Sequence, residues 1–70
     1  MFEVKATLIN HETGESFIEM DDVKVTFENG SVLVGFINDI SLSYDQIGLN
    51  IPFIEDIVHI HTDEIQSITK

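Results

Sequence analysis

The chain has 70 residues, with thirteen acidic residues against three lysines and no arginine, and its formal net charge is -10 at pH 7. Proteins that bind nucleic acids or anionic membranes place cations against phosphates, so this balance disfavours both classes. The absence of cysteine excludes disulfides and cysteine zinc sites. This length predicts one domain, residues 1–70, which buries only about 60% of its unfolded surface, so oligomerisation is an expected source of further burial.

Targeting signals are not visible in the sequence. No apolar run approaches the ~20 residues of a membrane-spanning helix. The first residues also lack the basic segment followed by an apolar segment that is typical of a signal peptide. We therefore expect a cytoplasmic protein without a membrane partner.

The N-terminal third predicts one or two strands. Residues 2–9 alternate apolar and polar side chains and are rich in β-branched residues, which favours a strand over a helix. Residues 10–14 form a polar turn that ends in Gly14. Residues 17–20 are expected to form a short second strand that pairs back to the first.

The central stretch, residues 23–40, predicts a β-hairpin. Val23, Val25 and Phe27 alternate with polar residues, and Asn29-Gly30 follows them as the signature of a type I′ turn. The return strand, residues 32–40, has apolar side chains on both faces. A glycine inside it, Gly35, indicates a bulge, a bend or a close backbone approach.

The last thirty residues predict three more strands. Residues 41–51 form a strand kinked near Asp45-Gln46, and Pro52 places residues 50–56 in a loop or at an edge. Residues 57–61 and 65–70 form two short strands around a tight turn at residues 62–64. The predicted fold is all-β: a small, strongly bent, five-stranded antiparallel barrel of Sm-like or SH3-like type, with an extra N-terminal strand or hairpin.

Two segments resemble the paired motifs of the Sm-like family, which includes Sm, LSm and Hfq proteins. The first motif has alternating apolar residues, a turn glycine, an apolar residue and a second glycine, matched here by Val25, Phe27, Gly30, Leu33, Gly35 and Ile37. The second motif matches residues 60–68. The resemblance covers residues 23–69 and implies a bent barrel that joins edge to edge into a homo-oligomeric ring of five to seven copies.

The residues that read RNA in this family are not retained. The Asp and Asn of the first motif fall on Ser41 and Asp45 here, and the Arg-Gly of the second motif is replaced by His61-Thr62. The RNA-pocket-equivalent positions, including two aromatic residues placed to stack on a base, are Phe36, Ser41, Tyr44, Asp45, His61 and Thr62. The resemblance therefore implies the barrel and the ring without implying RNA binding.

No set of side chains indicates an active site. His59 and His61 lie two apart and point to one face of a strand, where Asp63 or Glu64 would complete a metal site, but ordinary strand or interface histidines are the favoured interpretation. Adjacent carboxylates on strands point to opposite faces, and the serines lack a recognisable nucleophile motif. We expect no catalytic residue, no metal and no cofactor.

Three functions follow from these observations. The favoured one is a non-enzymatic Sm-like ring with a binding or scaffolding role. The second is an RNA-binding Sm-like protein. The third is an acidic SH3-like barrel that binds a basic protein, in a phage or mobile-element setting. Phe53 and Ile54, beside Pro52, either pack on the chain's own core or lie in a contact between subunits.

Overall fold

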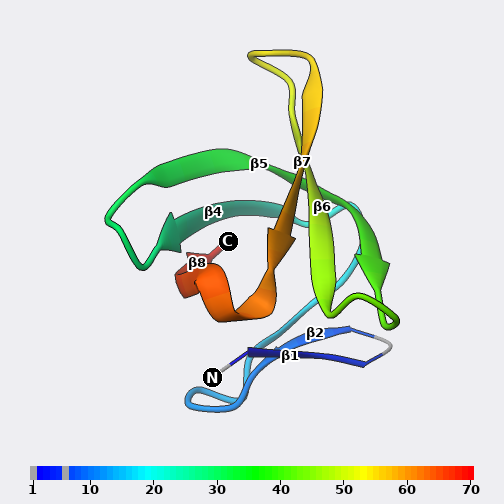
Figure 1. Cartoon of the computed structure of the whole chain (residues 1–70), viewed down its shortest axis with the longest axis vertical. Coiled ribbons are helices and arrows are strands. Elements are labelled where there is room, and N and C mark those ends of the chain that lie inside the picture. The colour runs from blue at the N-terminus through cyan, green and yellow to red at the C-terminus, as the bar shows by residue number, and fades with distance from the viewer. Residues whose placement is uncertain (1, 6) are drawn as a thin grey trace.

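The computed structural model describes residues 2–5 and 7–70 as an all-β protein with two antiparallel sheets (Figure 1). The smaller sheet has the order β1-β2-β3, and its strands are β1 (Phe2–Val4), β2 (Leu8–Asn10) and β3 (Ser16–Phe17). The larger sheet has the order β7-β6-β5-β4-β8, and its strands are β4 (Asp22–Phe27), β5 (Val32–Ser41), β6 (Gln46–Ile51), β7 (Asp56–His61) and β8 (Ile65–Thr69). A single turn of 3-10 helix, η1 (Thr62–Glu64), joins β7 to β8.

The predicted central hairpin is present, but its turn differs from the predicted type. Gly30 has a φ of 89°, whereas Asn29 does not adopt a positive φ, which a type I′ turn requires at both positions. Instead, the Gly30 N–H donates to the Phe27 carbonyl at 2.9 Å, which describes a type I turn followed by a left-handed glycine. The Asn29 side chain favours this geometry because it accepts a hydrogen bond from the Ser31 N–H at 2.9 Å.

Strand β5 joins two halves of the larger sheet, one in which it pairs with β4 and one in which it pairs with β6. Its first residues pair with β4 up to Phe36, and from Phe36 onward it pairs with β6, with a bulge between Ile37 and Asp39. Figure 1 shows β5 curving from one half to the other. A Cβ at Gly35 would lie 2.1 Å from the Asn50 carbonyl oxygen, so of the three alternatives predicted for Gly35 the close backbone approach is observed, and only glycine fits there.

The predicted continuous strand over residues 41–51 is wrong. Strand β5 ends at Ser41, the chain reverses over residues 42–45, and β6 returns antiparallel with Ser41 opposite Gln46. The turn closes because Asp45 adopts a φ of 53° and the Ser41 hydroxyl accepts a hydrogen bond from the Tyr44 N–H at 3.3 Å. Aspartate tolerates the left-handed region better than most residues, which explains a turn without glycine or proline.

The N-terminal segment is a small sheet of its own. The single strand predicted over residues 2–9 is divided into β1 and β2, which pair antiparallel with Phe2 opposite Asn10. The second predicted strand is confined to Ser16–Phe17 and pairs with β2, with Phe17 opposite Leu8. The expected additional strand or hairpin at the N-terminus is therefore a three-stranded sheet.

One hydrophobic core joins the two sheets. Both sheets contribute side chains to it, and its buried members are Phe2, Val4, Leu8, Phe17, Val23, Val25, Ile37, Ile47, Leu49, Ile51, Ile60, Ile65 and Ile68. The alternation of buried and exposed residues along β4 places every second side chain inside, as its sequence predicts. Within the described part of the chain, no helix has the length and apolar character needed to cross a membrane.

Candidate functional site

Five of the six predicted pocket positions lie at one end of the larger sheet. Ser41 ends β5, Tyr44 and Asp45 belong to the β5–β6 turn, and His61 and Thr62 end β7 and begin η1. The two segments meet because the first residue of β6, Gln46, pairs with His61.

The sixth position, Phe36, lies elsewhere on the sheet. It stands in the middle of β5, opposite Asp22 on β4 and Asn50 on β6. Phe36 precedes Ser41 by five residues, which is up to roughly 16 Å along an extended strand. Of the two aromatic residues considered for base stacking, only Tyr44 accompanies the other predicted positions.

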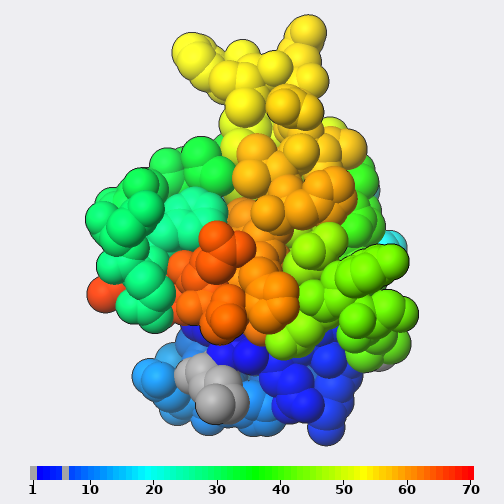
Figure 2. Space-filling model, viewed as in Figure 1, coloured from blue at the N-terminus to red at the C-terminus, as the bar shows by residue number. Residues whose placement is uncertain are grey.

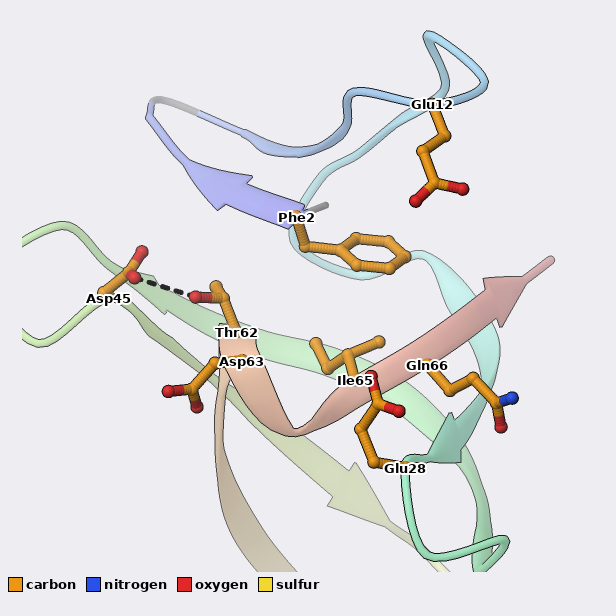
Figure 3. A pocket seen from close by; sticks show the side chains of 8 residues that line it. All are labelled: Phe2, Glu12, Glu28, Asp45, Thr62, Asp63, Ile65 and Gln66. Atoms are coloured by element: carbon orange, nitrogen blue, oxygen red, sulfur yellow. Dashed lines mark hydrogen bonds between the residues drawn. The ribbon is translucent and has the colours of Figure 1, made fainter.

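Asp45 and Thr62 join the turn to η1 at two points. The Thr62 hydroxyl donates to Oδ2 of Asp45 at 2.7 Å, and the Thr62 N–H donates to the Asp45 carbonyl at 3.1 Å (Figure 3). Thr62 is only 5% exposed, so its hydroxyl needs this partner in place of water. Asp45 and Thr62 therefore have a structural role, because they link the β5–β6 turn to η1.

The remaining polar contacts organise η1 itself. The His61 N–H donates to Oε1 of Glu64 at 2.9 Å, and Nδ1 of the His61 ring lies 2.8 Å from Oδ1 of Asp63. Both side chains of the His61–Asp63 pair are substantially exposed, so the pair contributes little to stability. It does hold the imidazole at the end of β7, beside the carboxylates of η1.

A cavity of about 500 Å³ lies between the N-terminal sheet and η1. Its lining combines an apolar floor with four carboxylates, and the lining residues are Phe2, Glu12, Glu28, Asp45, Thr62, Asp63, Ile65 and Gln66. In Figure 3 the Phe2 ring faces Ile65, and the acidic side chains lie around these two. The described residues that line the cavity include no lysine or histidine, so this lining disfavours phosphate and other anions.

Three of the cavity residues were not indicated by the sequence. Phe2 lies on β1, Glu12 lies in the turn between β2 and β3, and Glu28 lies in the β4–β5 turn. Their proximity to η1 depends on how the smaller sheet packs against the larger one. The only local signal is the alternation that predicts Phe2 as a buried strand residue.

In the described part of the chain, the two histidines considered as metal ligands are not joined by a suitably placed third ligand. His59 and His61 both lie on β7, as predicted, and Asp63 contacts His61. Over residues 2–5 and 7–70, no group of three or more histidine and carboxylate side chains is arranged to hold a metal ion.

Strands β7 and β8 lie at the two ends of the larger sheet, so within this sheet each of them pairs with a neighbouring strand along one edge only. Along a strand, successive N–H groups point to opposite sides. The Thr62 N–H donates to Asp45 on the β6 side, whereas the Ile57 and His61 N–H groups donate to the side chains of Asp56 and Glu64. The N–H of His59 therefore points away from β6, toward the outer edge of β7.

The β6–β7 hairpin carries the most exposed aromatic side chain of the described residues. Phe53 is 95% exposed, and Ile54 beside it is also exposed. Figure 2 shows this hairpin projecting from the body of the molecule. Of the two alternatives for Phe53 and Ile54, packing on the chain's own core is therefore wrong.

Comparison of this chain with family models, with curated proteins and with solved structures finds no match.

Proposed function

We propose that this chain is a non-enzymatic Sm-like module that assembles edge to edge into a homo-oligomeric ring of five to seven copies. The observation that carries the proposal is the strand order β7-β6-β5-β4-β8, which leaves β7 and β8 as the two end strands of one bent sheet. We further propose that the long, bent β5 and the close approach at Gly35 curl this sheet into a barrel. In the ring, β7 of one copy pairs with β8 of the next.

The composition of the two edges supports this assembly. Monomeric proteins protect sheet edges with lysine, proline or very short strands, because exposed N–H and C=O groups recruit other strands. Strands β7 and β8 have six and five residues, and neither contains lysine or proline. Edges of this kind are expected where a second strand covers them. Because the two edges differ, the contact is heterologous, and repeating it closes a ring where the rotation between copies permits.

Substituting His59 with proline tests the edge contact. Proline removes the N–H that points away from β6, so the pairing of β7 with β6 is retained and proline is tolerated at an edge. We expect His59→Pro to sediment and scatter light as a single chain of 7.9 kDa under conditions in which the unmodified protein is an oligomer.

The matched control is His59→Thr, which removes the imidazole and keeps the N–H. We expect this variant to retain the oligomeric mass, because a β-branched residue suits an edge strand. Circular dichroism of both variants verifies that the sheet is intact. An oligomer of unchanged mass in folded His59→Pro contradicts pairing through the outer edge of β7.

RNA binding is the second function, and the lining of the cavity opposes it. Asp45, Asp63, Glu12 and Glu28 face the space that a nucleotide would enter, and a ring multiplies the charge of -10 carried by each chain. We expect no submicromolar binding of oligo-U in a low-salt filter-binding titration. Submicromolar affinity that falls with added salt would instead establish an RNA-binding ring. The same carboxylates favour the third function, in which the acidic barrel binds a basic protein.

A further inference from the structure

The tip of the β6–β7 hairpin, residues 52–55, is a compact apolar projection with acidic flanks. Phe53 is almost fully exposed and Ile54 more than half exposed, whereas Glu55 and Asp56 follow directly. An exposed phenylalanine at the end of a projecting hairpin gains nothing from the chain's own core (Figure 2). Apolar groups in such a position are typical of protein interaction sites.

The outer face of the β4–β5 hairpin has the complementary character. Val32 and Val34 are exposed on β5, and Lys24 lies directly opposite Val34 on β4. Thr69 of β8 is on the other side of Lys24 in the sheet. We call Val32, Val34 and Lys24 the outer patch. It is a small apolar surface with a cation at its border.

Lys24 is an exposed cation on the outer face of β4. Its neighbours across the sheet are Val34 and Thr69, and the ion pairs formed among residues 2–5 and 7–70 do not include it. Lys70, in contrast, lies 3.5 Å from Asp21. In a chain with only three lysines, this placement leaves one cation on the outer patch for an acidic partner.

We propose that the hairpin tip of one copy docks on the outer patch of the next copy. Phe53 and Ile54 then cover Val32 and Val34, and Glu55 approaches Lys24. Charge complementarity identifies a second copy as the occupant, because the acidic tip and the basic border of the patch occur in the same chain. The tip and the patch lie on different strands, so each copy donates one tip and receives one, as a head-to-tail ring requires.

This inference depends on the proposed ring and adds a second contact to it. A stable interface buries about 800 Å² from each partner, which is nearly a fifth of the 4383 Å² surface of this chain. A hairpin tip alone covers less than that area. Docking of the tip therefore acts together with the pairing of β7 and β8.

The test combines removal of the Phe53 side chain with reversal of the charges at Lys24 and Glu55. We expect Phe53→Ser to raise the protein concentration at which half of the chains are assembled about thirtyfold, as for an aromatic hot spot. Lys24→Glu and Glu55→Lys are each expected to raise it several-fold. The double variant carrying both reversals restores assembly toward the unmodified value, because the pair is re-formed with exchanged charges. Sedimentation over a range of concentrations measures each midpoint.

Lys5→Glu is the control, because it makes the same charge change at an exposed lysine outside the outer patch, and its midpoint is expected to match that of the unmodified protein. If the single variants all assemble normally while His59→Pro is monomeric, the ring stands and docking of the tip is overturned. If the unmodified protein is monomeric, both proposals are overturned. If both reversals weaken assembly but the double variant does not recover, the pairing of Glu55 with Lys24 is overturned.

Discussion

Gly35→Ala is expected to destabilise the protein by about 3 kcal/mol or more, at the upper end of overpacking substitutions. The new Cβ would lie 2.1 Å from the carbonyl oxygen and 3.0 Å from the carbonyl carbon of Asn50, both backbone atoms that move only with β6. A domain of this length has a total stability of roughly 4 to 10 kcal/mol. The urea midpoint, followed by circular dichroism at a fixed protein concentration, measures the loss.

Two other glycines separate this steric effect from the general cost of replacing glycine. Gly14 has a φ of 80° and open space around it, so Gly14→Ala is expected to cost about 1 kcal/mol through backbone strain alone. The atoms nearest to a Cβ at Gly48 belong to the Asp39 side chain, which can rotate away, so Gly48→Ala is expected to cost less than Gly35→Ala. A Gly35→Ala loss no larger than that of Gly14→Ala contradicts the close approach of β5 and β6.

Phe17→Ala is expected to destabilise the protein by about 3 to 5 kcal/mol, the usual cost of deleting a buried phenylalanine side chain. Phe17 is fully buried, lies opposite Leu8 in the N-terminal sheet, and has Nζ of Lys70 5.6 Å from its ring centroid. Its removal opens a cavity where the two sheets share a core. Urea denaturation at one protein concentration is the measurement, since assembly makes the midpoint depend on concentration.

Leu42→Ala provides the control for Phe17→Ala. Leu42 is 66% exposed in the β5–β6 turn, so its truncation is expected to change the free energy of unfolding by about 0.5 kcal/mol or less. If Phe17→Ala unfolds at the same urea concentration as Leu42→Ala, the N-terminal sheet does not belong to the core.

The strands of the larger sheet were largely predictable, because strand alternation is a local signal. Val23 and Val25 are buried at the positions that their alternation predicts, and Gly35 predicted a bulge, a bend or a close backbone approach, of which the close approach is observed. The reversal between β5 and β6 was missed because it depends on Asp45 in the left-handed region and on the Ser41 hydroxyl. Ser and Asp are common in turns, but here Ser41, Ser43 and Asp45 alternate with Leu42 and Tyr44, and such alternation is also the pattern of a strand.

The N-terminal sheet and the cavity were less predictable. The chain reverses between Val4 and Leu8 without glycine or proline, so a single strand was the simpler interpretation of the alternation. The cavity then depends on where this sheet packs, which brings Phe2 and Glu12 to the same space as Asp63. Proximity of this kind is decided by tertiary packing and leaves no spacing pattern in the sequence.

The mass of the unmodified protein in solution, measured by size-exclusion chromatography with light scattering, tests the proposed assembly most directly. The pairing of β7 with β8 predicts a single species with five to seven times the 7.9 kDa mass of one chain. A species of 7.9 kDa that persists at high protein concentration would contradict the ring, and with it the docking of the hairpin tip.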